Sequence, residues 1–291
     1  MSTVTGAPVV VGVDGSKSAL GAVRLAAREA RLRGRPLRVV HAFIWPLLNV
    51  PLGPSPAGPL DGGLRHDAEL IVEEAVAEAA RTEPGLALTA QIVNGAAAPV
   101  LLGESRHAAL VVLGDRGLGG FTGLLVGSVA VQVVAHAECP VLVARGEPRA
   151  DGPVVVGVDG SPLSGLAVGF AVEEAALRET GVVAVHAWTR PVSTGPGDML
   201  PLVYDVDAVE AEEDRVLAES VAGWGDRYPE VPVTHRLVRG PTRATLIDES
   251  ARAQLLVVGA RGRGGFAGLL LGSVSQAVLH HAGCPVAVIR A

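Results

Sequence analysis

The stretch that decides the fold reads Val9-Val-Val-Gly-Val-Asp-Gly-Ser16, and it recurs as Val154-Val-Val-Gly-Val-Asp-Gly-Ser161. Asp159 stands 145 residues after Asp14. The same shift carries other landmarks onto their copies: His41-Ala42 onto His186-Ala187, Gly114 onto Gly259, Gly127-Ser128 onto Gly272-Ser273, His136 onto His281 and Cys139-Pro-Val onto Cys284-Pro-Val. A constant shift across so many landmarks indicates a tandem duplication.

The chain of 291 residues is long enough for two domains of ordinary size. Between the copies, Gly146-Glu-Pro-Arg-Ala-Asp-Gly-Pro153 contains only turn-forming, small and charged residues, as expected of a linker. We therefore predict one domain over residues 1–147 and a second over residues 152–291.

The composition narrows the class of protein. Hydrophobic residues make up 49% of the chain and charged residues 19%, a balance typical of compact globular proteins. The net charge of −6 and the aromatic content of 3% both argue against a nucleic-acid partner. No segment approaches roughly 18 uninterrupted apolar residues, and the first residues do not read as an export signal. We expect a soluble, cytoplasmic protein that binds neither nucleic acid nor a membrane.

Short apolar runs alternate with stretches of helical periodicity in both copies. In the first copy we predict strands at residues 9–13, 37–43, 88–93, 110–113 and 141–144, helices at 16–33, 64–82, 99–106 and 128–136, and a Pro/Gly-rich loop at 46–63. The second copy is predicted to repeat this order. Cys139 and Cys284 each precede a proline and an apolar run, so each reads as the buried start of a strand rather than as a disulfide partner.

Apolar strands that alternate with helices indicate a parallel sheet covered on both faces. The fold class is therefore α/β, with two tandem doubly wound domains of five parallel strands and an assumed strand order of 3-2-1-4-5. In this order a crevice opens beyond the carboxyl ends of strands one and four. Asp14 and Gly114 follow or end those strands, so we expect them to meet there.

A glycine-rich loop follows the fourth strand in each copy. Gly114-Asp-Arg-Gly117 leads through nine residues to Gly127-Ser128, and the second copy has the same spacing from Gly259 to Ser273. Glycines let backbone N–H groups approach phosphate oxygens, and the start of the next helix adds N–H donors and a partial positive charge. The pattern predicts a phosphate-binding loop in each copy, with the hydroxyls of Ser128 and Ser273 as further donors.

Two other interpretations stay open. The glycines would also allow a loop to pack tightly against a helix. Asp14 and Asp159 would also cap the helices that follow them, beside Ser16 and Ser161.

Other sites of known chemistry are not indicated. The loop lacks the Gly-Lys-Ser/Thr ending of common ATPases, since the only lysine is Lys17. The Rossmann spacing of glycines is absent after strand one, and so are a nucleophile elbow and a metal-ligand set. His41 and His186, at the ends of strands, read as hydrogen-bonded core or rim histidines, with contact to a ligand as the alternative.

These features resemble the universal stress protein family in its tandem-domain, ATP-binding form, over nearly the whole chain. The likeness rests on the Val-Gly-Val-Asp-Gly-Ser stretches, on the loops with their inner Arg-Gly and Gly-Gly-Phe, and on the Cys-Pro-Val strands. It implies an adenine nucleotide α-hydrolase-like fold and ATP as ligand, with Mg²⁺ left open. It also implies that Asp14 and Asp159 face the nucleoside and that backbone groups near Ala42 and Ala187 hold adenine.

The resemblance extends to a full set of binding residues in each copy. In the first copy they are Val13, Asp14, Ala42, Gly114, Arg116, Gly117, Gly127, Ser128 and Val129. In the second copy they are Val158, Asp159, Ala187, Gly259, Arg261, Gly262, Gly272, Ser273, Val274 and Ser275.

The two loops differ at two positions. The second copy keeps a family hydroxyl at Ser275 where the first has Ala130, and the first has Asp115 where the second has Ala260. Asp115 would repel phosphates or instead help to hold Mg²⁺. We expect ATP to bind more tightly to the second copy.

Three functions remain open at this stage. The first is a regulator of stress response or growth whose state an unidentified protein partner reads. The second is a slow ATPase or autophosphorylating enzyme, in which Ser128, Ser273 or another loop residue receives phosphate. The third is a sensor of AMP or cyclic AMP. The family also pairs the edges of its sheets, which implies a homodimer or pairing of the two domains within the chain.

Overall fold

A computed structural model describes residues 6–44, 61–118, 126–146, 149–189, 205–263 and 270–290. Apart from its last two residues, the chain divides into two compact units, Met1–Arg145 and Gly146–Ile289. The predicted loop at 46–63 lies largely outside the described residues. No helix in the described ranges is long and apolar enough to cross a membrane.

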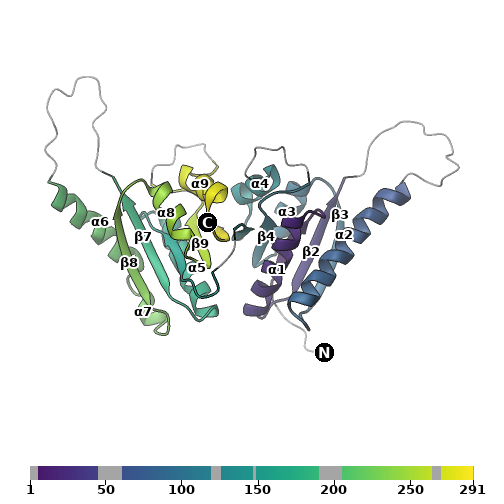
Figure 1. Ribbon diagram of the computed structural model, residues 1–291, viewed down its shortest axis with the longest axis horizontal. Helices are drawn as coiled ribbons and strands as arrows, with labels where there is room; N and C mark the ends of the chain where they lie inside the picture. The colour runs from purple at the N-terminus through teal and green to yellow at the C-terminus, as the bar shows by residue number, and fades with distance from the viewer. Residues whose placement is uncertain are drawn as a thin grey trace, which may run out of the picture. The chain divides into compact units, whose positions relative to one another are not determined.

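The first unit is built on five parallel strands (Figure 1). They are β1 (Val9–Val13), β2 (Leu37–Phe43), β3 (Leu88–Asn94), β4 (Leu110–Gly114) and β5 (Val141–Ala144). Their order is 3-2-1-4-5, which confirms the prediction. In the central strand β1, Val11 pairs with Val39 of β2 and with Val112 of β4.

Helices cover the sheet of the first unit. They are α1 (Lys17–Leu32), α2 (Asp61–Thr82), α3 (Ala97–Ser105) and α4 (Ser128–His136). Helix α1 packs against α2, and α3 packs against α4. The helix predicted from residue 64 begins three residues earlier, and the one predicted from residue 99 begins two residues earlier.

Small apolar residues fill the core of the first unit. Val9, Val10 and Val11 are fully buried because helices cover both faces of β1. The buried positions of α1 fall on one face of the helix: Ala19, Ala22, Val23, Ala26, Ala27, Glu29 and Ala30. Glu29 is the charged member of that face, and its carboxylate lies 2.9 Å from the Arg33 guanidinium.

The second unit repeats this plan, as predicted from the duplication. Its strands are β6 (Val154–Gly157), β7 (Val182–Trp188), β8 (Val233–Arg239), β9 (Leu255–Gly259) and β10 (Val286–Ile289), in the order 10-9-6-7-8. Its helices are α5 (Pro162–Leu177), α6 (Val206–Val221), α7 (Trp224–Arg227), α8 (Thr242–Ser250) and α9 (Ser273–His281). The short α7 was not predicted.

The two cysteines are buried as free thiols at the approach to a strand. Strands β5 and β10 begin two residues after them. Burial raises the pKa of Cys139 to about 11 and that of Cys284 to about 12. At neutral pH both thiols are therefore protonated and unreactive.

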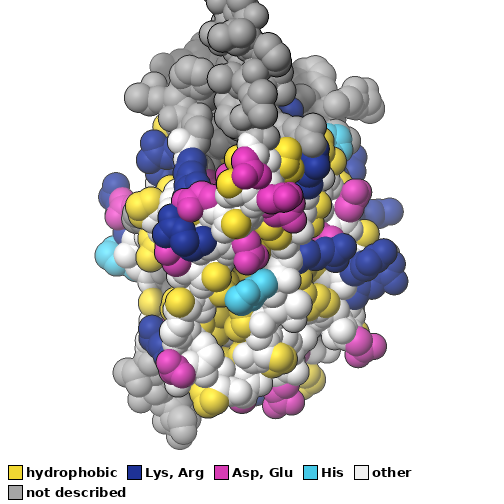
Figure 2. All heavy atoms as spheres, turned by 90° about the vertical axis from the view of Figure 1, so that its left-hand side faces the viewer, with side chains coloured by type: hydrophobic (Ala, Val, Ile, Leu, Met, Phe, Trp, Pro, Cys, Tyr) yellow, Lys and Arg dark blue, Asp and Glu magenta, His cyan; other side chains and the backbone are white. Residues whose placement is uncertain are grey.

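The outer face of the second unit, where β8 and α6 lie, carries basic and acidic side chains mixed together (Figure 2). On α6, Arg215 contacts Glu212 and Glu219 at 2.6 and 2.7 Å. On β8, Arg236 lies 2.9 Å from Glu249. These arginines therefore have carboxylate partners and form no continuous basic stripe on this face.

Candidate functional site

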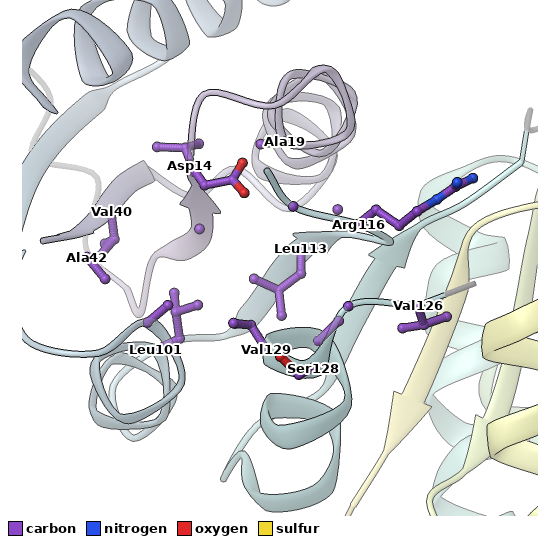
Figure 3. Close-up of a pocket in the computed structure, with 17 residues that line it drawn as sticks. Asp14, Ala19, Val40, Ala42, Leu101, Leu113, Arg116, Val126, Ser128 and Val129 are labelled. Carbon is purple, nitrogen blue, oxygen red and sulfur yellow. The ribbon is translucent and has the colours of Figure 1, made fainter. Parts of the chain in front are cut away.

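The first unit holds a cavity of about 440 Å³ beyond the carboxyl ends of β1 and β4 (Figure 3). One end is apolar and is lined by Val40 and Ala42 of β2 and by Leu101 of α3. The opposite end is formed by the glycine-rich loop and by Ser128 at the start of α4. The volume suits a small-molecule ligand, which needs roughly 300–1,000 Å³.

Asp14 joins the two loops that border this cavity. Its Oδ1 accepts a hydrogen bond from the Ser16 N–H at 3.0 Å, and its Oδ2 accepts one from the Leu118 N–H at 2.9 Å. The N-cap of α1 is Ser16, whose hydroxyl accepts from the Ala19 N–H at 3.1 Å. Helix capping is thus done by the serine, and the carboxylate is left at the cavity.

The glycines of the loop are required for different reasons. A Cβ at Gly117 would overlap the Asp14 carboxylate, and one at Gly114 would come within 2.9 Å of the backbone of Ser18. Packing explains these two glycines. A Cβ at Gly127 would meet nothing closer than 3.7 Å, and the φ of this residue is an ordinary −69°. Packing therefore does not require glycine at 127.

Gly127 is the N-cap of α4, and no side chain caps this helix. Its N–H donates to the Asp115 carbonyl at 2.8 Å, which fixes the loop against the helix. Ser128 and Val129 of the first turn line the cavity. A helix start without a side-chain cap offers N–H donors and a partial positive charge, so it fits an anionic group such as phosphate.

Asp115 does not belong to the described lining of the cavity. Its Oδ1 accepts a hydrogen bond from the Ser18 hydroxyl at 2.7 Å, and its Oδ2 lies 3.5 Å from Arg145 and 3.6 Å from Arg116. Two guanidinium groups thus compensate its charge. In the described part of the chain, no group of three or more His, Cys, Asp or Glu residues is placed to hold a metal ion.

The second unit has a cavity of about 520 Å³ at the same place. Asp159 accepts hydrogen bonds from the N–H and hydroxyl of Ser161 at 3.0 and 2.6 Å, and from the Arg263 N–H at 2.8 Å. Burial alone would raise the pKa of Asp159, but the hydrogen bonds from Ser161, Arg263 and Ser164 outweigh it and lower that pKa. The carboxylate is therefore ionised at neutral pH.

Two hydroxyls in the second cavity bond to the backbone. Ser275 is buried, and its hydroxyl donates to the carbonyls of Gly259 at 2.8 Å and Ala260 at 3.1 Å. Its proton therefore ties α9 to the glycine-rich loop, and Ala130 cannot do so in the first unit. The Thr242 hydroxyl donates to the Ala187 carbonyl at 3.2 Å.

The strand-end histidines are held by the backbone and are not part of the described cavity linings. Nδ1 of His41 lies 2.8 Å from the Val13 carbonyl. Nδ1 of His186 lies 2.6 Å from the Val158 carbonyl, and its Nε2 lies 2.7 Å from Glu213. These contacts fit the interpretation as hydrogen-bonded core or rim histidines.

The structure brings all the proposed binding residues of each copy to the lining of one cavity. Sequence reasoning missed the walls that α3 and α8 contribute. Those missed residues include Ala97, Leu101, Thr242 and Leu246, together with Ala19 and Ser164. A signal was present, because the shift of 145 residues pairs Leu101 with Leu246 in the helix after the third strand.

The chain matches the model of the universal stress protein family twice, over residues 7–145 and 152–290. It belongs to the universal stress protein family. It is 42% identical over 294 residues to universal stress protein Rv2623 of Mycobacterium tuberculosis, and the match covers 97% of this chain and 96% of that protein. The tandem arrangement predicted from the sequence is thereby confirmed.

Solved structures of the family are similar as well. A universal stress protein from Archaeoglobus fulgidus covers 98% of both chains with a TM-score of 0.69 and 17% sequence identity. Another Archaeoglobus fulgidus structure, described as a complex with dAMP, is 25% identical over 49% of this chain, with a TM-score of 0.36.

Proposed function

We propose that each unit of this universal stress protein binds one adenine nucleotide, with ATP as the physiological ligand. The observation that carries the proposal is the start of α4 and of α9. At both places a glycine is the N-cap of a helix that has no side-chain cap, although packing does not require a glycine there. Each helix start lines a cavity whose other end is apolar. An apolar recess opposite an N–H-rich helix start suits a nucleotide, which joins a flat base to phosphates.

We infer a place for each part of the ligand from the residues that line the cavity. The base would lie at the apolar end near Ala42 and Leu101, with the backbone of Ala42 as its polar contact. The carboxylate of Asp14 would accept hydrogen bonds from ribose hydroxyls. The phosphates would lie against Gly127 and Ser128, where N–H and hydroxyl donors meet.

We propose that the nucleotide acts as a regulatory ligand that the protein does not turn over. In the described lining, the carboxylates are Asp14 and Asp159, and each already accepts at least two hydrogen bonds. Such groups suit binding better than proton transfer. The occupied protein would act in the cytoplasm, as a homodimer, on a protein partner in stress response or growth control.

We further propose that ATP binds more tightly to the second unit. The hydroxyl of Ser275 fixes the loop there, and Ala130 leaves the first loop without that bond. A loop held in its binding conformation loses less entropy when the ligand arrives.

The first experiment is to denature freshly purified protein and to identify any released nucleotide by chromatography and mass. Calorimetry with ATP, AMP and cyclic AMP then gives affinities, and phosphorus NMR detects hydrolysis or phosphorylation. Nucleotide near two per chain, unchanged over time, supports the proposal. No released nucleotide and no binding contradicts it, and steady hydrolysis would point to the enzyme instead.

Matched glycine variants assign the sites. Gly117→Ala and Gly262→Ala place a Cβ against the aspartate at the cavity, and each should abolish binding in its own unit. Gly103→Ala and Gly165→Ala are the controls, because a Cβ at either helical position meets nothing within 4 Å. Tighter residual binding in Gly262→Ala than in Gly117→Ala would contradict the proposed order of affinities.

A further inference from the structure

The two glycine-rich loops differ in charge at the end of the cavity where phosphates are proposed to bind. Residues 114–118 contain one aspartate and one arginine, which cancel. Residues 259–263 contain two arginines and no carboxylate. The remainder of each loop, up to Gly127 and Gly272, has no charged residue. The second loop is therefore more positive than the first.

In the first unit, the arginine of the glycine-rich loop lies next to a carboxylate of the same loop. Nε of Arg116 lies 3.6 Å from Oδ2 of Asp115, and its side chain points away from the other labelled residues of the cavity (Figure 3). Arg145 lies 3.5 Å from the same oxygen. Leu118, which follows Gly117, is 72% exposed and brings no charge to the rim.

In the second unit an arginine takes the position of Leu118. The N–H of Arg263 donates to Asp159, and Arg263 belongs to the cavity lining. Its guanidinium lies over Gly160, where a Cβ would overlap it, so the glycine leaves room for the charge at the rim. The neighbouring carboxylate of Glu212 is paired with Arg215 at 2.6 Å, and the charge of Arg263 acts on it as a weaker influence. Arg261, in the place of Arg116, has Ala260 beside it instead of a carboxylate.

We propose that the second cavity selects adenine nucleotides by the number of their phosphates and prefers ATP to AMP, while the first cavity discriminates much less. This inference rests on the proposed nucleotide binding. ATP carries about two more negative charges than AMP, and each attraction to a rim guanidinium is favourable by the amount typical of an exposed ion pair. The first loop, where the charges cancel, gains little from the additional phosphates.

The asymmetry has a consequence for regulation. When ATP is replaced by AMP at constant total adenylate, the first cavity stays occupied and the second loses its ligand. A partner that reads the second unit would then respond to the energy state of the cell, whereas one that reads the first would respond to total adenylate. The two copies would thus report different quantities from one chain.

Exchange of a single exposed residue tests the proposal in the full-length protein. Arg263→Leu gives the second loop the residue of the first, and Leu118→Arg does the reverse. We expect Arg263→Leu to lower the ratio of the AMP Kd to the ATP Kd at the second site about fivefold, and Leu118→Arg to raise that ratio at the first site by a similar factor. Calorimetry with ATP and AMP measures both ratios, and Arg227→Leu, on α7, is the charge control.

Salt provides a second test that needs no variant. Salt screens exposed charges. In the unaltered protein, a rise in ionic strength should therefore reduce the ratio of the AMP Kd to the ATP Kd at the second site and leave this ratio nearly constant at the first site. Two sites with equal ratios, unaffected by both exchanges, would overturn the inference while nucleotide binding stands. Absence of any ATP or AMP binding would overturn the proposed function together with it.

Discussion

At the scale of single residues, Asp159 makes the stability of the second unit depend on pH. Its hydrogen bonds keep its pKa below the usual value of ~3.9, so the folded unit favours the carboxylate more than the unfolded chain does. The resulting stability is present above the unfolded-state pKa and is lost as the pH falls through the folded-state pKa. We expect Asp159→Asn to be less stable than the unaltered protein at pH 7 and to approach it in stability below about pH 4.

Urea unfolding of both proteins between pH 3 and pH 7 measures this difference. Gly165→Ala is the control, because its Cβ meets nothing and it carries no titrating group. A difference in the free energy of unfolding that stays constant down to pH 3 would show that the Asp159 charge contributes nothing to stability.

The sequence predicted the positions of some site residues but not the contacts of others. Asp14 follows one buried strand and Gly114 ends another, so the assumed strand order of 3-2-1-4-5 was enough to predict that they meet. The bond from the Thr242 hydroxyl to Ala187 could not be foreseen, since it depends on how α8 is rotated against β7. The role of Ser275 was only half predicted, because its donation to Gly259 requires the three-dimensional path of the loop.

At the scale of elements, His186 joins β7 to α6. The Val158 carbonyl and the Glu213 carboxylate both lie within hydrogen-bonding distance of its ring. Both are hydrogen-bond acceptors, so the ring connects the residue that follows β6 with α6 through its two nitrogens. In the first unit, Ala68 stands where the repeat would place Glu213, and the contact to α2 is absent from the described residues.

We expect Glu213→Ala to lower the stability of the second unit by about 1–3 kcal/mol, because the buried ring loses the partner of one nitrogen. Hydrogen exchange read by mass spectrometry follows each unit separately. Protection should fall in β7 and α6 and stay unchanged in the first unit, where no carboxylate of the described residues is seen to contact His41. An equal loss of protection in both units, or no loss at all, would contradict a stabilising contact between His186 and Glu213 that acts only within the second unit.

The elements themselves were largely predictable. Strands ended within one residue of their predicted bounds in the first unit, since continuous apolar runs bounded by turn residues specify buried strands. Helix α7 was missed because four residues carry no periodicity. A Cβ at Gly169 of α5 would come within 2.9 Å of the Trp224 ring, so contacts distant in the sequence hold this turn in place.

At the scale of the whole molecule, the duplication supplies one buried cysteine to each unit. Cys139 belongs to the first unit and Cys284 to the second, and both have raised pKa values. A thiol reagent at pH 8 should therefore react slowly with the native protein and rapidly after denaturation. Cys284 is fully buried and Cys139 is 9% exposed, so Cys139 should react first.

Because each unit contains one buried cysteine, the rate at which each cysteine is labelled measures the opening of its own unit. If labelling requires opening of a unit, ATP at about one hundred times its Kd should slow the reaction of each cysteine by up to about a hundredfold. In Gly262→Ala this protection should vanish at Cys284 and persist at Cys139, and Gly117→Ala should give the converse. Mass spectrometry of the labelled peptides measures both rates in one sample. Equal protection of both cysteines in either variant would mean that the units open together, so that nucleotide at one site stabilises the whole chain.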